Sequence, residues 1–377
     1  MKKYEIVENW VKTGMQSGRF LPGDQLPPES QISAELSVAR NSVRQAIGNL
    51  NAQGFVETRQ GVGTFCLAPA HAATGSRDIA LICFSTSQYI FPDLVNGVQA
   101  TLNRTGYHMI LSQTACDAKI EREMLLGLRD RGIAGIVLEP SFGGDGFSNA
   151  DVVRDLVDTG VPVVLVDNAT PDEDFSSITM DDYAGGRLAA SHLYERGHRD
   201  IGIVFDSDYL PKIRRRNGAV ECLAERGIEV PQGWHVSYRT PHNSDAVQSQ
   251  IRTCLTASDS RPTAFCCSSD DEAMDVIAAA TEAGLSVPDD ISIVGFDNAT
   301  LASHGRIGLT TIDHPTRYIA ELATNLLLHS IRHPEIVSST ITSVRPRLVS
   351  RNSVRDLRSS DRSKKTNKEK PYASQRT

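Results

Sequence analysis

Four long polar side chains fall on one side of a short predicted helix: Arg40, Asn41, Arg44 and Gln45. Val43, Ile47 and Leu50 recur at positions i, i+4 and i+7, so they share the other face and can pack against a neighbouring helix. In the major groove of DNA, arginine can bind guanine, and asparagine or glutamine can bind adenine, through two hydrogen bonds. The spacing allows a DNA-reading helix, and it also allows a solvated surface helix.

The residues around this helix favour the first interpretation. They comprise segments 18–29 (GRFLPGDQLPPE), 38–44 (VARNSVR), 54–56 (GFV) and 60–65 (QGVGTF). Together they resemble the winged helix-turn-helix domain of GntR-type repressors over about 50 residues. The resemblance implies a recognition helix followed by a β-hairpin, the wing. We expect this DNA-binding domain at residues 1–67, followed by a linker at residues 68–77.

The resemblance also implies which residues contact operator DNA. The matching positions are Arg40, Asn41, Ser42 and Arg44 in the helix, Gln60 and Gly61 in the wing, and Ser30 in the preceding helix. Ser30 stands where an arginine is common in the family, and Ala39 stands where Ser or Thr is common. These two departures predict fewer phosphate contacts or an altered operator.

From residue 78 onwards, short apolar runs alternate with amphipathic helices. A first series of runs lies at 79–84, 109–111, 135–138 and 163–166, and a second lies at 201–205, 264–267 and 291–295. Continuous apolar strands that alternate with helices predict parallel sheets with helices on both faces. Two such α/β lobes predict a cleft between them.

This region resembles a second family. The segments are 197–202 (GHRDIG), 215–218 (RRNG), 287–297 (VPDDISIVGFD) and 309–312 (LTTI). They resemble the effector domain of LacI/GalR regulators, which is built like periplasmic sugar-binding proteins. A GntR-type reader before such a domain is the arrangement of AraR-type arabinose repressors, and segments 89–92 (YIFP) and 313–315 (DHP) resemble that group in particular.

We therefore expect an α/β chain in which an N-terminal winged helix-turn-helix domain precedes a two-lobed, doubly wound effector domain like a periplasmic binding protein. The effector domain should cover residues 78–351, with one lobe at about 78–181 and 313–340 and the other at about 182–312 and 341–351. Residues 352–377 are basic and nearly free of apolar side chains, which predicts a disordered tail.

Ligands of open α/β sheets bind at the carboxyl ends of the strands. The residue types offered there that can hydrogen-bond a sugar are Gln88, Tyr89, Glu139 and Asp181. The family resemblance adds Arg215, Asp270 and Asp297, with Ser269 where the family usually has Asn, and His314 as a weaker candidate. The aromatic candidates to stack on a sugar ring are Tyr89, Phe91, Trp234 and Tyr238. Two assignments have structural alternatives, because Asp297 could cap the following turn and Asp181 could cap the helix that follows it.

The net charge of −7 is unevenly distributed. Residues 1–70 carry +1 and residues 351–377 carry +6, so the 280 residues between them carry −14. This asymmetry fits a DNA-binding domain coupled to an acidic domain.

Seven cysteines without a C-x-x-C pair indicate free thiols in a reducing compartment. The chain has neither a signal peptide nor an apolar run long enough to span a membrane, so we expect a cytoplasmic protein.

Two other classes of function fit the sequence less well. A sugar-processing enzyme would need a catalytic arrangement, but Asp270 and Asp271 are adjacent in sequence and no nucleophile motif, P-loop or metal-ligand spacing appears. A transport binding protein would not need the winged helix. The sequence predicts a homodimeric repressor that binds a palindromic operator and releases it on binding a sugar, with no cofactor or metal. The resemblance points to L-arabinose, and another sugar or a sugar phosphate stays open.

Overall fold

The computed structural model describes residues 2–16, 19–20, 23–52, 55–59, 61–66, 76–87, 89–143, 146–168, 174–240, 242–257, 260–304, 307–336 and 338–358. Within these ranges, no helix is both long and apolar enough to cross a membrane. Most of the expected linker, up to residue 75, lies outside the described residues.

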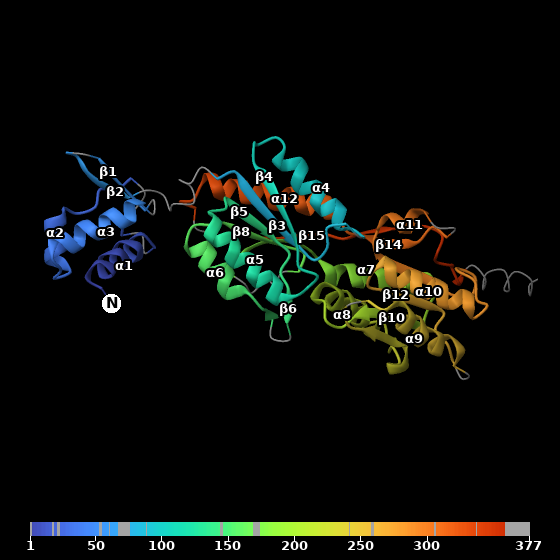
Figure 1. Cartoon of the computed structure of the whole chain (residues 1–377). Coiled ribbons are helices and arrows are strands. Elements are labelled where there is room, and N and C mark those ends of the chain that lie inside the picture. The colour runs from blue at the N-terminus through green and yellow to red at the C-terminus, as the bar shows by residue number, and fades with distance from the viewer. Residues whose placement is uncertain are drawn as a thin grey trace, which may run out of the picture.

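In its described residues, the N-terminal domain contains three helices and a hairpin (Figure 1). These are α1 (Lys3–Gln16), α2 (Glu29–Glu35), α3 (Arg40–Ala52) and the antiparallel strands β1 (Val56–Arg59) and β2 (Gly63–Cys66). The predicted inner face of α3 is buried, with Val43 and Leu50 fully inaccessible and packed together with Val7, Val11 and Ile32. This core orients the opposite face of α3 toward solvent.

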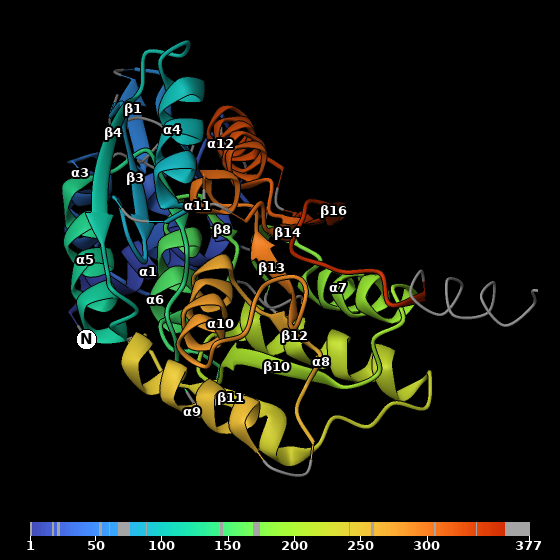
Figure 2. The ribbon, with the colours of Figure 1, turned by 90° about the vertical axis from the view of Figure 1, so that its right-hand side faces the viewer.

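The first lobe contains a six-stranded parallel sheet in the order β15-β9-β8-β5-β3-β4. Its strands are β3 (Asp78–Cys83), β4 (His108–Gln113), β5 (Gly135–Leu138), β8 (Val163–Val166), β9 (Ser176–Met180) and β15 (Ile341–Val344). Figure 2 shows α4 (Phe91–Leu102) and α12 (Thr316–Arg332) together on one side of β3 and β4. The helices α5 (Ala118–Arg131) and α6 (Ala150–Asp158) pack on the other face, next to a short hairpin of β6 (Phe142–Gly143) and β7 (Gly146–Phe147).

The second lobe repeats this plan with the strand order β11-β10-β12-β13-β14-β16. Its strands are β10 (Ile201–Asp206), β11 (His235–Tyr238), β12 (Ala264–Cys267), β13 (Ser292–Asp297), β14 (Thr310–Asp313) and the antiparallel edge strand β16 (Arg347–Val349). One pair of packed helices is α7 (Asp182–Glu195) with α8 (Leu210–Ala224), and the other is α9 (Ser244–Thr256) with α10 (Asp270–Glu282). Two short helices, η1 (Gln232–Trp234) and α11 (Thr300–His304), complete the lobe, and Trp234 lies in its apolar core.

The chain passes between the lobes three times, after β9, after β14 and after β15. The third crossing corrects the predicted lobe boundary, because residues 341–344 belong to the first lobe. Ile341 lies opposite Ser177 in a parallel pair of β15 with β9. An exposed edge strand of four residues carries too weak a pattern for its sheet to be assigned from sequence.

The prediction of a disordered tail from residue 352 is also wrong for its first seven residues. Ser353 is fully buried, its hydroxyl donates to the carbonyl of Ile293 at 2.6 Å, and it accepts from the amide of Thr310 at 2.8 Å. Residues 352–358 are thus held on the second lobe by hydrogen bonds, which leave no hydrophobic pattern in the sequence. Residues 359–377 lie outside the described residues.

Asp270 joins three strand ends of the second lobe. Its carboxylate accepts from the Thr311 hydroxyl at 2.6 Å and from the Ala299 amide at 2.7 Å, so α10 is tied to β14 and to the turn after β13. The side chain is fully buried, and burial, followed by the charge of Asp297, raises its pKa to about 8.

We predict that Asp270→Asn weakens the pH dependence of stability. An aspartate with a raised pKa in the folded state binds more protons there than in the unfolded chain, so its contribution to stability falls as pH rises from about 4 towards 8. Each pKa unit corresponds to about 1.4 kcal/mol. Asparagine can replace both contacts without titrating, because its oxygen accepts from the Ala299 amide and its NH2 group donates to the Thr311 hydroxyl oxygen, which is both donor and acceptor. Denaturant unfolding between pH 5 and 8 should show a smaller decline for the variant than for the wild type, and equal declines would contradict the assignment.

Candidate functional site

The outward face of α3 presents the predicted DNA-reading residues. Arg40, Asn41 and Arg44 are exposed, and Ser42 is half-buried. Arg44 lies beside Glu29 at the start of α2, with Nη2 3.1 Å from Oε2 and Nε 3.4 Å from Oε1. The Arg44 side chain is 71% exposed, so this ion pair contributes little to stability and leaves the guanidinium available to DNA.

The wing, residues 56–66, is fixed to the helical part of the domain. The side-chain Nε2 of Gln25 donates to the carbonyl of Val62 at 2.9 Å, and the backbone of Gln25 forms an isolated β-bridge with Phe65. Val62 at the hairpin turn is 63% exposed, and Gly61 beside it has a φ of +75°. Ser30 is exposed on α2, whereas Gln60 lies outside the described residues. The domain therefore offers two adjacent protrusions, α3 and the wing.

A cavity of about 400 Å³ lies between the two lobes of the effector domain. Loops after β3, β4 and β8 line it from the first lobe, and loops after β10, β11, β12, β13 and β14 line it from the second. Its polar lining residues are Tyr89, Asp167, Asp182, Asp206, Tyr209, Lys212, Arg215, Tyr238, Thr240, His242, Ser269, Asp271, Asp297 and His314. It thus lies at the carboxyl ends of the strands of both sheets, where the fold predicts a ligand.

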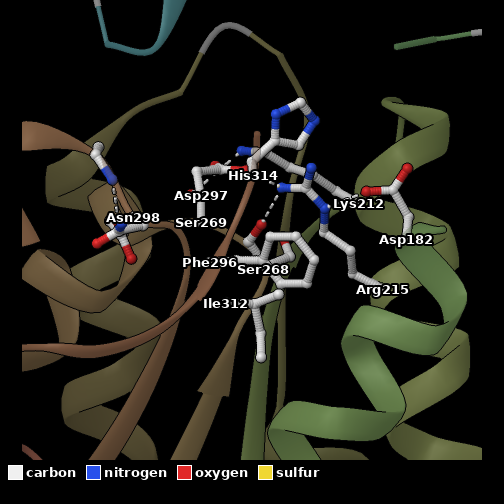
Figure 3. Close-up of polar contacts among 12 residues, drawn as sticks. Asp182, Lys212, Arg215, Ser268, Ser269, Phe296, Asp297, Asn298, Ile312 and His314 are labelled. Atoms are coloured by element: carbon white, nitrogen blue, oxygen red, sulfur yellow. Dashed lines mark hydrogen bonds and ion pairs between the residues drawn. The ribbon is translucent and has the colours of Figure 1, made fainter. Parts of the chain in front are cut away.

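Arg215 is the centre of the buried polar contacts (Figure 3). Its Nε donates to Asp182 Oδ1 and its Nη1 to Asp297 Oδ1, both at 2.8 Å, and Nη1 also donates to the carbonyl of Ser268 at 2.9 Å. The guanidinium lies 3.8 Å above the centre of the Phe296 ring. Burial alone would lower the pKa of Arg215, but the two carboxylates outweigh it and raise the pKa, so the charge is kept.

Close packing of α7 against α8 positions this arginine. Gly186 on α7 and Gly218 on α8 face the backbone of the other helix, and a Cβ at either position would lie within about 2 Å of a carbonyl oxygen. Gly218 ends the Arg-Arg-Asn-Gly segment, so the same short motif supplies the arginine and the close helix contact that directs it into the cavity.

Two tyrosines connect the lobes across the cavity. Tyr89 from the first lobe donates to Asp297 Oδ2 at 2.7 Å and accepts from the amide of Asp270 at 2.9 Å. Tyr209 from the second lobe donates to Glu139 Oε1 at 2.7 Å. Burial, followed by the charge of Asp167, raises the pKa of Glu139 to about 7. Each tyrosine therefore binds a carboxylate of the opposite lobe.

Asp167 offers an acceptor that the described residues do not satisfy. Its Oδ1 atom is buried and makes no hydrogen bond to any of them. His314 Nε2 lies 3.4 Å from this oxygen, so the two side chains form an ion pair when His314 is protonated. Burial alone would lower the pKa of His314, and the charge of Asp167 reverses this and raises it. A buried acceptor without a donor indicates a ligand or a water in that place.

The structure brings only part of the predicted effector set together. Five of the predicted residues line the cavity: Tyr89, Arg215, Ser269, Asp297 and His314. The carboxylates of Glu139 and Asp270 are used in the internal hydrogen bonds given above, and Asp181 accepts from the amide of Ala184 as the N-cap of α7. None of these three lines the cavity, and Gln88 lies outside the described residues.

Sequence reasoning missed several charged lining residues: Asp167, Asp182, Asp206, Lys212, His242 and Asp271. Asp167 carried a usable signal, because it directly follows the apolar run 163–166 as Asp297 follows its own apolar run. Asp206 is the last residue of β10, as Asp297 is of β13. Lys212 and His242 come from helix and loop positions whose direction depends on tertiary packing.

Family models match the chain in two places. Residues 3–66 match the gntR family of bacterial regulatory proteins, and residues 190–354 match a periplasmic binding protein-like domain. The chain is 31% identical to the arabinose metabolism transcriptional repressor of Geobacillus stearothermophilus over 359 residues, which cover 95% of this chain and 99% of the relative. It is 28% identical to the repressor of the same name from Halalkalibacterium halodurans, over 87% of this chain and 89% of the relative.

Among solved structures, the LacI family transcriptional regulator of Enterococcus faecium with bound ribose is similar. It matches with a TM-score of 0.63 and 25% identity, over 74% of this chain and 99% of that one. The N-terminal domain, the two-lobed effector domain and the full-length match to a repressor agree with one another. The chain belongs to the family of the arabinose metabolism transcriptional repressors, with a GntR-type DNA-binding domain followed by a LacI-type sugar-responsive domain.

Proposed function

We propose that this repressor binds a palindromic operator as a homodimer in the cytoplasm and releases it when L-arabinose enters the cavity between its lobes. The names of its relatives support arabinose as the effector. The observation that carries the proposal is the buried Arg215 cluster, which presents fixed donors and acceptors to the cavity. Adjacent hydroxyl groups of a sugar can each donate and accept, so they suit such a mixed set of partners.

The charges around the cavity favour an uncharged sugar over a sugar phosphate. Five lining carboxylates face two permanent cations, and both cations already have carboxylate partners. Arg215 is held by Asp182 and Asp297, and Lys212 lies 3.2 Å from the buried carboxylate of Glu272. A phosphate would meet net negative charge and no unpaired arginine or lysine among the described lining residues.

The tyrosine contacts suggest how the sugar acts on DNA binding. A ligand that touches both lobes stabilises one arrangement of the lobes more than another, and the difference in its affinity for the two arrangements is the coupling free energy. We infer that the arrangement of the lobes favoured by the sugar separates or rotates the two DNA-binding domains of the dimer. They then no longer fit operator half-sites one helical turn apart.

We predict that Arg44→Ala weakens operator binding by roughly 1–3 kcal/mol, because a bidentate contact to a base edge is lost. Binding should be measured by fluorescence anisotropy at fixed salt. Arg252→Ala is the matched control, since Arg252 is also exposed and paired, with Glu282, but lies on the second lobe. If Arg44→Ala and the control bind the operator as the wild type does, α3 does not read the operator through Arg44.

We predict that Asp297→Asn still binds the operator but no longer releases it with L-arabinose. The substitution removes one acceptor that faces Arg215 and Tyr89, and an unpaired buried polar group costs about 1–3 kcal/mol. A gel shift across an arabinose titration measures this, with thermal unfolding to verify the fold. Asp181→Ser keeps the helix cap outside the cavity and should respond normally.

Two results of this titration would contradict the proposal. If Asp297→Asn responds to arabinose as the wild type does, Asp297 has only a structural role. Release of the wild-type protein by arabinose 5-phosphate and not by arabinose would show that the effector is the wrong class of sugar.

A further inference from the structure

The cavity extends across the second lobe well beyond the Arg215 cluster. Its lining residues follow all five parallel strands of that sheet, in the spatial order β14, β13, β12, β10 and β11. Neighbouring strands lie about 4.8 Å apart, so the lining residues are spread over about 19 Å of the sheet. A single pentose ring is narrower than two strand spacings. The Arg215 cluster, which includes Asp297 and His314, lines the part of the cavity over β12–β14. Other residues line the part over β10 and β11.

We call the other side the outer pocket and define it by Asp206, Tyr238, Thr240, His242 and Asp271. Two of these residues form a tilted aromatic surface, because the rings of Tyr238 and His242 lie 4.7 Å apart between centres at an angle of 37°. The Nε2 atom of His242 lies 2.8 Å from Asp275 Oδ2. The hydroxyl of Tyr238 is bonded to Glu272 and Lys212, so this ring is held in place, and a fixed aromatic ring can pack against the C–H face of a sugar ring.

Acceptors and donors surround this aromatic surface. Asp206 accepts from the Thr240 hydroxyl and from the amide of Asp208, so its carboxylate is held in place. Asp271, by contrast, is half-buried, and within the described ranges no hydrogen bond reaches its carboxylate. Lys212, which lies between the two sides of the cavity, donates to Tyr238 Oη at 2.7 Å. The outer pocket thus combines two tilted aromatic rings with a carboxylate, that of Asp271, to which no described residue donates, and apolar rings beside a few polar groups are the composition of a sugar subsite.

We infer that the outer pocket binds a second sugar unit, linked by a glycosidic bond to the unit held at the Arg215 cluster. The ligand class is a short, uncharged pentose oligosaccharide, with a disaccharide as its smallest member. The inference rests on the proposed function, because it takes the Arg215 cluster as the site of the first unit. The cavity volume of about 400 Å³ lies within the range of roughly 300–1,000 Å³ that is typical of pockets for drug-sized ligands.

Calorimetric titration of the full-length protein with L-arabinose and with α-1,5-linked L-arabinobiose tests this inference. We expect the disaccharide to bind about tenfold more tightly or better, since it adds a stacking contact and a hydrogen bond to a carboxylate. Asp271→Ala and His242→Ala should each remove most of this advantage while changing arabinose affinity less than about twofold. Asp245→Ala is the matched control, because it also removes a carboxylate from the first turn of a helix of the second lobe, on α9 and outside the cavity.

The outcomes separate the inference from the proposed function. If arabinose binds but the disaccharide binds no more tightly, or if both outer-pocket variants weaken the two sugars equally, the inference is wrong while the proposed function stands. If only the disaccharide binds, the outer pocket is supported and arabinose alone is not the effector. Binding of neither sugar contradicts the proposed effector, and the inference with it. Thermal unfolding of each variant excludes a loss of fold.

Discussion

The effector domain depends on one buried charge. Arg215 is almost inaccessible to water, and a guanidinium in that position must be paired, because removal of one partner from a buried ion pair costs about 3–5 kcal/mol. Its partners come from two separate elements, Asp182 at the start of α7 and Asp297 at the end of β13. The arginine therefore fixes the relative positions of α7, α8 and β13. The same bonds fix the direction of the carboxylates that a ligand would meet.

The DNA-binding domain, in contrast, keeps its functional charges exposed. Its important polar groups are exposed and only weakly held, as in the pair of Arg44 and Glu29. A charge that has to exchange one partner for a DNA base cannot also be buried in a strong ion pair. Its precision comes instead from the apolar core under α3 and from Gln25, which fixes the position of the wing.

Much of this architecture could be predicted from the sequence, because its signals are local. The period of Val43, Ile47 and Leu50 defined a helix, and the apolar runs after residue 78 defined parallel strands. The site was predicted less well, since the direction of a carboxylate depends on contacts far away in the chain. Asp270 and Asp297 both follow strands, yet Asp270 turns towards Thr311 and Ala299 while Asp297 faces the cavity. The segment 352–358 was missed because hydrogen bonds such as those of Ser353 have no sequence period.

The three crossings between the lobes have a mechanical consequence. Asp182 begins α7 directly after the first crossing strand, and His314 directly follows β14 at the second, so two cavity residues belong to the connecting segments themselves. Three connections between the same two lobes hinder sliding of one lobe over the other. They leave hinge bending as the relative motion of the lobes. A ligand that contacts Asp182 and His314 therefore acts at the hinge itself, where it changes the stiffness of the connecting segments. Contacts with Tyr89 and Tyr209 act away from the hinge, where they change the angle between the two lobes.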